Sequence, residues 1–168
     1  MRPAPGDYAS FYAGYVEQVK NDSANSALQD SLFYLENFLN DIPENKAEYR
    51  YEDGKWSVLQ VIQHLIDTER IMCYRALCIA RGEKVELPGF DETEYANLAE
   101  VSHRSLKSLF FELNLVRKST LHLFHSFTNE MLERRGIANH YEVTVNALAF
   151  IIVGHTSHHI NILKVKYL

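Results

Sequence analysis

The feature that most constrains the fold is the spacing of apolar residues over long segments that contain almost no proline or glycine. In the clearest segment, mostly apolar side chains recur at intervals of three and four residues from Leu106 to Phe127. Such intervals place side chains on one face of an α-helix. Only 7 glycines and 4 prolines occur among the 168 residues, so little interrupts these segments. The pattern therefore favours long helices.

The same periodicity predicts four long helices joined by short or medium connections. The predicted segments cover residues 22–41, 58–81, 102–127 and 144–168. Ser57 and Gln60 make a capping box at the start of the second segment, and Gly82 suits the position just after its last turn. Ser102 and Thr144 are the expected N-caps of the third and fourth segments. Four such helices predict an all-α four-helix bundle.

Shorter elements are expected between and before these helices. Aromatic and apolar residues at helical spacing predict a short extra helix at the N-terminus, over residues 8–19. Residues 91–100 are expected to form a short helix or a turn. Residues 128–136 should add one or two helical turns that end at Gly136, and residues 138–143 should cross back to the last helix. No segment gives a strand signal longer than a few residues.

Composition and net charge argue against two kinds of partner, nucleic acids and membranes. A hydrophobic fraction of 46% with 23% charged residues is typical of a soluble globular protein, and the length fits a single domain over residues 1–168. The net charge of −5 and the lack of a dense run of basic residues lead us to expect no nucleic-acid partner. No run approaches the ~20 apolar residues of a membrane span, so we expect no membrane association.

The two cysteines indicate a reducing, cytoplasmic setting. Cys73 and Cys78 lie on one predicted helix and point in different directions. They suit neither a C-x-x-C metal pair nor a mutual disulfide. The N-terminal residues also lack the apolar core of a secretory signal.

The last predicted helix carries the sequence GHTSHH within an otherwise apolar segment. His155 and His159 continue the apolar stripe of that helix, four residues apart, so both imidazoles can reach one ion. Polar groups on a core face cost free energy unless something satisfies them. A bound transition metal would do so.

A third ligand is expected from the second predicted helix, where His64 lies outside the polar face together with Thr68 and Arg75. We hypothesise that His64, His155 and His159 bind one divalent ion and leave positions open for water or substrate. Zinc, nickel or a related ion suits three imidazoles. The alternative is a set of partly buried, hydrogen-bonded histidines, because the pattern lacks the glutamate of the H-E-x-x-H motif.

Other polar residues have more ordinary expected roles. Glu69 points towards apolar neighbours and should form a structural ion pair, with Arg75 or Arg117 as its partner. Arg75 shares the helix face of His64, so it is also a candidate for orienting an anionic group of a substrate. His158 is expected at the boundary of the core. The remaining histidines are expected at or near the surface: His103, His122, His125 and His140.

Three segments, residues 55–82, 87–95 and 149–168, together resemble the DinB/YfiT-like superfamily of metal-dependent proteins. The matching motif residues are Trp56, Ser57, His64, Leu65 and Glu69 in the first segment, and Gly154, His155, His158 and His159 in the last. The position after the first histidine of the C-terminal motif is often acidic in this family. In this chain it is Thr156.

The resemblance implies a four-helix bundle, often a homodimer, with a divalent ion held by His64, His155 and His159. Members with assigned activity use low-molecular-weight thiols, as S-transferases that join bacillithiol or mycothiol to electrophiles or as a thiol-dependent isomerase. We therefore expect a bacillithiol-like thiol S-transferase with a small-molecule substrate. The alternatives are a hydrolase whose nucleophile is metal-bound water, and a non-catalytic dimeric bundle that binds a metal for stability or ligand binding.

Overall fold

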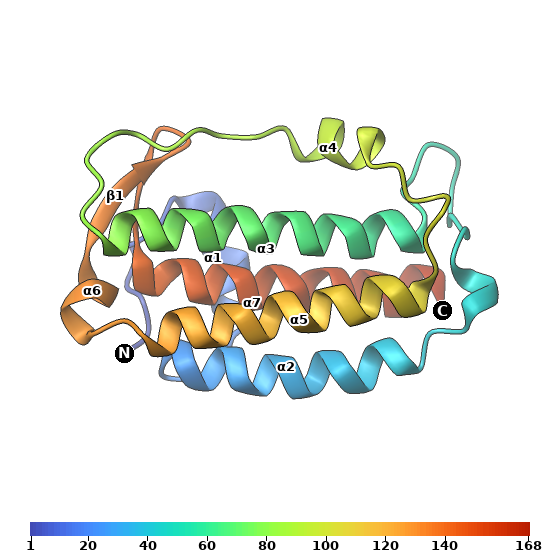
Figure 1. Ribbon diagram of the computed structural model, residues 1–168, viewed down its shortest axis with the longest axis horizontal. Helices are drawn as coiled ribbons and strands as arrows, with labels where there is room; N and C mark the ends of the chain where they lie inside the picture. The colour runs from blue at the N-terminus through green and yellow to red at the C-terminus, as the bar shows by residue number, and fades with distance from the viewer.

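Four long helices packed side by side form the body of the protein in the computed structural model, which describes residues 1–168 (Figure 1). They are α2 (Ala24–Asn40), α3 (Val58–Ala80), α5 (Leu106–His125) and α7 (Val145–Ile162), and a π-helical turn, Leu163–Tyr167, extends α7. The predicted all-α four-helix bundle is therefore confirmed. No helix is both long enough and apolar enough to cross a membrane.

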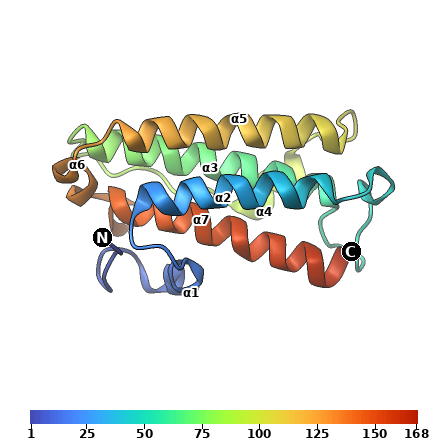
Figure 2. The same ribbon diagram turned by 90° about the horizontal axis from the view of Figure 1, so that it is seen from below.

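Shorter helices cover the ends and one side of this bundle. They are the 3₁₀ turn Ser10–Tyr12, α1 (Ala13–Gln18), the 3₁₀ turn Glu44–Lys46, α4 (Glu92–Leu98) and α6 (Asn129–Glu133). The predicted N-terminal helix is present as the first 3₁₀ turn followed by α1. This segment packs against α7 on the outside of the bundle (Figure 2), whereas α4 lies over α3 (Figure 1).

Local capping signals fix where the long helices begin and end. At the start of α3, the Ser57 hydroxyl accepts from the backbone N–H of Gln60, while the Gln60 side chain accepts from the backbone N–H of Ser57. This reciprocal pair is the predicted capping box. The Thr144 hydroxyl caps α7 in the same position. Gly82 has a φ of 88°, a left-handed conformation that a residue with a side chain rarely adopts, so α3 ends there.

A β-hairpin replaces the expected connection before α7. Strands β1 (Arg135–Ala138) and β2 (Tyr141–Thr144) pair antiparallel, and Asn139 and His140 form the turn with φ angles of 52° and 69°. We expected helical turns over residues 128–136 that end at Gly136. The helix α6 ends earlier, at Glu133, and Gly136 lies in β1, so this part of the prediction is wrong. Strands of four residues are too short to show alternation clearly, and the turn lacks the Asn-Gly pair that signals a tight hairpin.

The start of α5 also differs from the expectation. Its N-cap is Ser105, whose hydroxyl accepts from the backbone N–H of Ser108, and not Ser102. The Ser102 hydroxyl instead donates to the carboxylate of Glu100 in the preceding loop, at 2.5 Å. Both serines can cap a helix, and the competing local bond decides between them.

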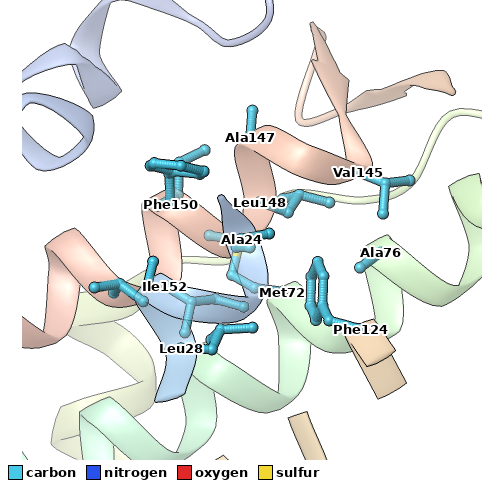
Figure 3. Packing of buried hydrophobic residues seen from close by; sticks show 14 of the residues in the cluster. Ala24, Leu28, Met72, Ala76, Phe124, Val145, Ala147, Leu148, Phe150 and Ile152 are labelled. Atoms are coloured by element: carbon cyan, nitrogen blue, oxygen red, sulfur yellow. The ribbon is translucent and has the colours of Figure 1, made fainter. Parts of the chain in front are cut away.

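Buried apolar side chains form two clusters, one towards each end of the bundle. The first contains residues such as Leu28, Met72, Phe124 and Leu148 (Figure 3). The second contains residues such as Leu35, Ile62, Leu109 and Ile160. Between them every long helix places buried polar residues towards the centre: Ser31, His64, Thr68, Glu69, Arg117, Thr120, His155 and Thr156. A polar layer therefore crosses the middle of an otherwise apolar core.

Gly154 lets α1 approach α7 closely, just before His155. A Cβ atom built on Gly154 would lie 2.1 Å from the backbone carbonyl oxygen of Tyr15. The backbone of α1 thus occupies the space that any side chain at this position would need. Gly14, within α1 itself, has open space around the corresponding point.

Replacing Gly154 with alanine should destabilise the protein, because the added methyl group would overlap a backbone oxygen that cannot rotate away. We expect the free energy of unfolding to fall by ~1–3 kcal/mol, the usual cost of overpacking. Urea denaturation measures this. The control Gly14→Ala should leave stability unchanged or raise it by ~0.5–1 kcal/mol. Equal effects of the two substitutions would contradict the close approach of α1 and α7.

Candidate metal centre

The structure brings the three predicted ligands together at one point between α3 and α7. His64 comes from the second turn of α3, and His155 and His159 come from successive turns of α7. One ring nitrogen from each side chain lies within 4.8 Å of the others, and the Nε2 atoms of His64 and His155 are 2.9 Å apart. Because His155 and His159 are four residues apart on a helix, both rings face His64.

The three imidazoles are neutral at ordinary pH. Burial lowers the pKa of His64 to about 4. Burial, together with repulsion from His64 and His158, lowers the pKa of His159 to about 3. Burial also holds the pKa of His155 well below its usual value, and the other histidines of the cluster lower it further. Each ring therefore keeps a nitrogen lone pair available for a metal.

The donor set fits a divalent transition metal. Three neutral imidazole nitrogens with no carboxylate among them suit zinc and related first-row ions. A zinc ion bonded at ~2.1 Å to two nitrogens keeps those nitrogens within ~4.2 Å of each other. The spacing of this cluster thus needs only small side-chain movements to bind one ion.

Aromatic side chains hold the histidine rings in place. The rings of Trp56 and His64 have centroids 4.9 Å apart, and those of Tyr15 and His155 are 5.5 Å apart. The hydroxyl oxygen of Thr68 lies 3.5 Å from Nδ1 of His64, which leaves Nε2 directed at the cluster. Tyr15 was not among the residues singled out in the sequence, because only the packing of α1 on α7 brings it here.

A buried ion pair lies beside the cluster and joins the long helices. Arg117 on α5 donates from Nε and Nη2 to the two carboxylate oxygens of Glu69 on α3, both at 2.8 Å. Its Nη2 also donates to the hydroxyl of Thr156 on α7 at 2.9 Å, and its Nη1 donates to Ser31 on α2. The Thr120 hydroxyl donates to Glu69 at 2.7 Å. Glu69 therefore has a structural ion pair as expected, with Arg117 as its partner.

The remaining candidates lie outside the cluster. His158 is half-buried, as expected at the boundary, and its ring packs against Tyr15. Arg75 is buried but takes no part in the ion pair with Glu69. The other four histidines are exposed: His103, His122, His125 and His140.

Two cavities reach the cluster. The first has a volume of about 240 Å³, and Arg75, Thr68, Tyr15 and His155 are among its lining residues. The second, of about 320 Å³, is lined by His159 and by aromatic side chains that include Trp56. Different histidines of the same cluster thus face different cavities.

One family model matches most of the chain. The sequence model of the DinB superfamily matches residues 27–163, which include all three histidines of the cluster. A relative from Oceanobacillus iheyensis is 20% identical over 128 residues, covering 76% of this chain and 73% of the relative. A relative from Bacillus licheniformis is 26% identical over 131 residues, covering 74% and 72%. Both relatives are named as proposed metal-dependent hydrolases.

A solved structure shares the fold. YfiT from Bacillus subtilis superposes with a TM-score of 0.70 at 19% identity, covering 82% of this chain and 79% of that protein. It is described as a proposed metal-dependent hydrolase with an unusual four-helix-bundle topology.

Breaking the buried ion pair should destabilise the bundle strongly. Arg117→Met leaves the Glu69 carboxylate buried without a cation, which typically costs ~3–5 kcal/mol. Arg70→Met is the matched control, because Arg70 pairs with Glu112 at 2.7 Å while its side chain is 52% exposed. It should cost no more than ~1 kcal/mol. Similar losses in urea denaturation would contradict a structural role for the buried pair.

The metal-free protein should lose stability as the pH falls below about 6.5. In the folded chain burial holds the pKa of His64 at about 4 and that of His159 at about 3, whereas unfolded histidines titrate near 6.5. Between these values the unfolded state binds more protons, so stability rises with pH. Urea denaturation of EDTA-treated protein at about pH 7 and about pH 5 measures the difference.

Two variants show whether this pH dependence comes from the cluster. The double variant His64→Leu and His159→Leu should lose much of the stability difference, because both buried titrating groups are gone. His122→Gln should keep it, because His122 is exposed on α5. An unchanged pH dependence in the double variant would assign the effect to other groups.

Proposed function

The chain belongs to the DinB superfamily, and from this premise we propose that it is a metal-dependent enzyme that acts on a small molecule. The observation that carries the proposal is the cluster of three neutral, converging imidazoles formed by His64, His155 and His159. The description of two relatives as proposed metal-dependent hydrolases gives independent support. Zinc or nickel is the ion that we propose.

When bound, a divalent ion lowers the pKa of a coordinated thiol or water and so supplies a nucleophile near neutral pH. The chain's own residues prepare the site for this chemistry. The three imidazoles stay unprotonated and available to the ion, because burial keeps their pKa values low. Trp56 and Tyr15 pack against the rings of His64 and His155 and help to hold them in place.

Within this class we propose a low-molecular-weight-thiol S-transferase, with bacillithiol or a similar thiol as one substrate. The two cavities that reach the cluster support a reaction of two small molecules, since each can hold one of them beside a different histidine. The thiolate sulfur would form a bond to an electrophilic carbon, the leaving group would depart with its electron pair, and the thiol proton would pass to solvent.

The protein's own cysteines support an external thiol. Burial, and to a smaller extent the charge of Glu69, raises the pKa of Cys73 to about 12, so its thiol stays protonated. Its sulfur lies 3.1 Å from the hydroxyl of Thr120, beside the ion pair and away from the cavities. Neither Cys73 nor Cys78 lines a cavity at the cluster. In the proposed transferase, the nucleophilic sulfur would therefore come from a substrate.

The names of the relatives favour a second candidate, a hydrolase in which water is the nucleophile. The three histidines would hold the ion in the same way for this reaction as for the transferase. One of the two cavities would then hold the whole substrate. The two candidates differ in whether a thiol is consumed.

We also propose that the protein is a cytoplasmic homodimer. Two free cysteines suit a reducing compartment. Phe33 on α2 is 70% exposed, and Phe111 and Leu115 on α5 are 67% and 51% exposed. Because α2 and α5 pack together, these side chains leave an apolar surface on the two helices that a second copy could cover. Sedimentation analysis of wild-type protein and of Phe111→Lys tests this proposal, with a shift to monomer expected in the variant.

The metal assignment predicts the metal content of two variants. Untagged wild-type protein should carry about one divalent ion per chain, because three imidazoles form a site of high affinity. His159→Ala should lose that ion, whereas His158→Ala should keep it, since His158 lies outside the cluster. Mass-spectrometric metal analysis measures both. A full complement in His159→Ala would remove His159 from the ligand set.

The reaction can be tested with metal-loaded protein, bacillithiol and a chlorinated aromatic electrophile. We expect formation of the thioether and release of chloride, and loss of both in His159→Ala. An activated ester without thiol serves as the parallel hydrolase substrate. Ester turnover without any thioether formation would favour the hydrolase. The absence of both reactions would favour a bundle that binds metal without catalysis.

A further inference from the structure

Arg75 is a buried cation without a counter-charge. The residue is 3% exposed, yet no carboxylate of the chain lies within ion-pairing distance of it. Its Nη2 donates to the backbone carbonyl oxygen of Pro88 at 2.7 Å. Its Nη1 lies 3.7 Å from the thioether sulfur of Met72, Nε has no hydrogen-bond partner, and the guanidinium also lies next to the hydroxyl of Tyr12.

A comparison with Arg117 shows that Arg75 lacks a carboxylate partner. Arg117 is equally buried, and its Nε and Nη2 bind both oxygens of Glu69 side by side. The same edge of the Arg75 guanidinium lacks such a partner. Its Nε has no hydrogen-bond partner, and Nη2 donates one of its two N–H groups to the carbonyl oxygen of Pro88 and has the other left over. A buried charge without such a partner is costly. An anion from outside the chain would supply the missing partner.

Arg75 lines the cavity of about 240 Å³ that also reaches His155 of the histidine cluster. Thr68 lines the same cavity and lies beside His64. The rest of the wall is largely aromatic or apolar, with contributions from Phe11, Tyr12, Tyr15, Met72, Phe90 and Ile151. A molecule held at Arg75 therefore extends along an apolar wall towards the cluster.

Tyr12 offers a second polar contact next to Arg75. Burial raises the pKa of Tyr12, and the neighbouring Arg75 guanidinium only partly offsets this rise. The phenol therefore keeps its proton and can donate a hydrogen bond to an anion. The ring of Phe90 lies 5.9 Å from the guanidinium carbon and covers Arg75 from the side of the loop before α4.

The size and charge of the cavity narrow the class of ligand. Its volume of about 240 Å³ suits a small molecule. Arg75 and Glu92 are the only charged residues in its wall, because the imidazole of His155 is neutral. Because Glu92 in the same wall repels negative charge, the cavity suits a singly charged anion better than the double charge of a phosphate. The planar edge of a guanidinium also matches a carboxylate in shape.

We propose that Arg75, with Tyr12, binds the carboxylate of a small substrate whose reacting group then lies at the histidine cluster. This inference rests on the proposed function, because it takes the cluster as the reacting centre. Arg75 thereby selects carboxylate-bearing substrates from neutral molecules of the same shape.

Binding of benzoate and of its neutral counterpart benzamide tests the proposal. Calorimetric titrations use wild-type protein in zinc-loaded and EDTA-treated forms, so that binding to the metal is separated from binding to Arg75. We expect wild-type protein to bind benzoate in both forms and Arg75→Met to bind it ~10- to 100-fold more weakly, the loss of one or two charged hydrogen bonds. Benzamide should bind equally weakly to both proteins.

The control variant is Arg70→Met, which removes an exposed arginine from the same helix and should keep wild-type affinity for benzoate. Metal analysis of Arg75→Met should give the wild-type content, so a failure of the metal assignment is recognised separately. A side-chain ¹⁵Nε NMR signal that shifts on addition of benzoate to wild-type protein, and that is absent from Arg75→Lys, tests the contact without relying on the stability of Arg75→Met. Equal benzoate affinity in wild-type protein and Arg75→Met, or an unmoved Nε signal, would overturn the proposal.

Discussion

The buried ion pair between Glu69 and Arg117 is the interaction on which the arrangement of the bundle depends. Through it, α5 is bonded to α3 directly, to α7 through Thr156 and to α2 through Ser31. An apolar core would tolerate a helix that slides or rotates by a fraction of a turn, whereas these directional bonds are satisfied in one register only. Thr156 adjoins His155, and Glu69 lies on the helix of His64. The same bonds that align the helices therefore also align the histidines.

The polar layer explains how buried histidines are accommodated in a core of this size. It lies between two apolar clusters, so the burial of apolar side chains on either side offsets the cost of desolvating the polar residues. Glu69 and Arg117 satisfy each other, and so the ion pair needs no external partner. Arg75 is different, because its Nε has no partner within the chain. Arg75 lines the cavity that also reaches His155 of the histidine cluster.

Most of the fold follows from signals within single segments. Helical spacing predicts the four long helices, and the Ser57 and Thr144 caps locate two of their starts correctly, because a cap depends on residues three positions away. The pairing of His155 with His159 is equally local. His64 was predicted as the third ligand from its position outside the polar face of the second predicted helix, and the family resemblance implied the same residue. Features that depend on contacts between distant segments were not predictable: the choice of Arg117 over Arg75 by Glu69, the place of Tyr15 on His155, and the short hairpin.

The absence of a side chain at Gly154 affects which parts of the sequence can change the shape of the cavity. It admits α1 against α7, and the segment that ends in α1 contributes Tyr12 and Tyr15 to the cavity beside the cluster. Both tyrosines precede residue 27, where the match to the superfamily begins, whereas all three histidines lie within the matched part. Part of the wall that a substrate would meet thus lies on a stretch of sequence separate from the three histidines. Changes in the N-terminal segment can reshape the cavity without replacing any of the three histidines.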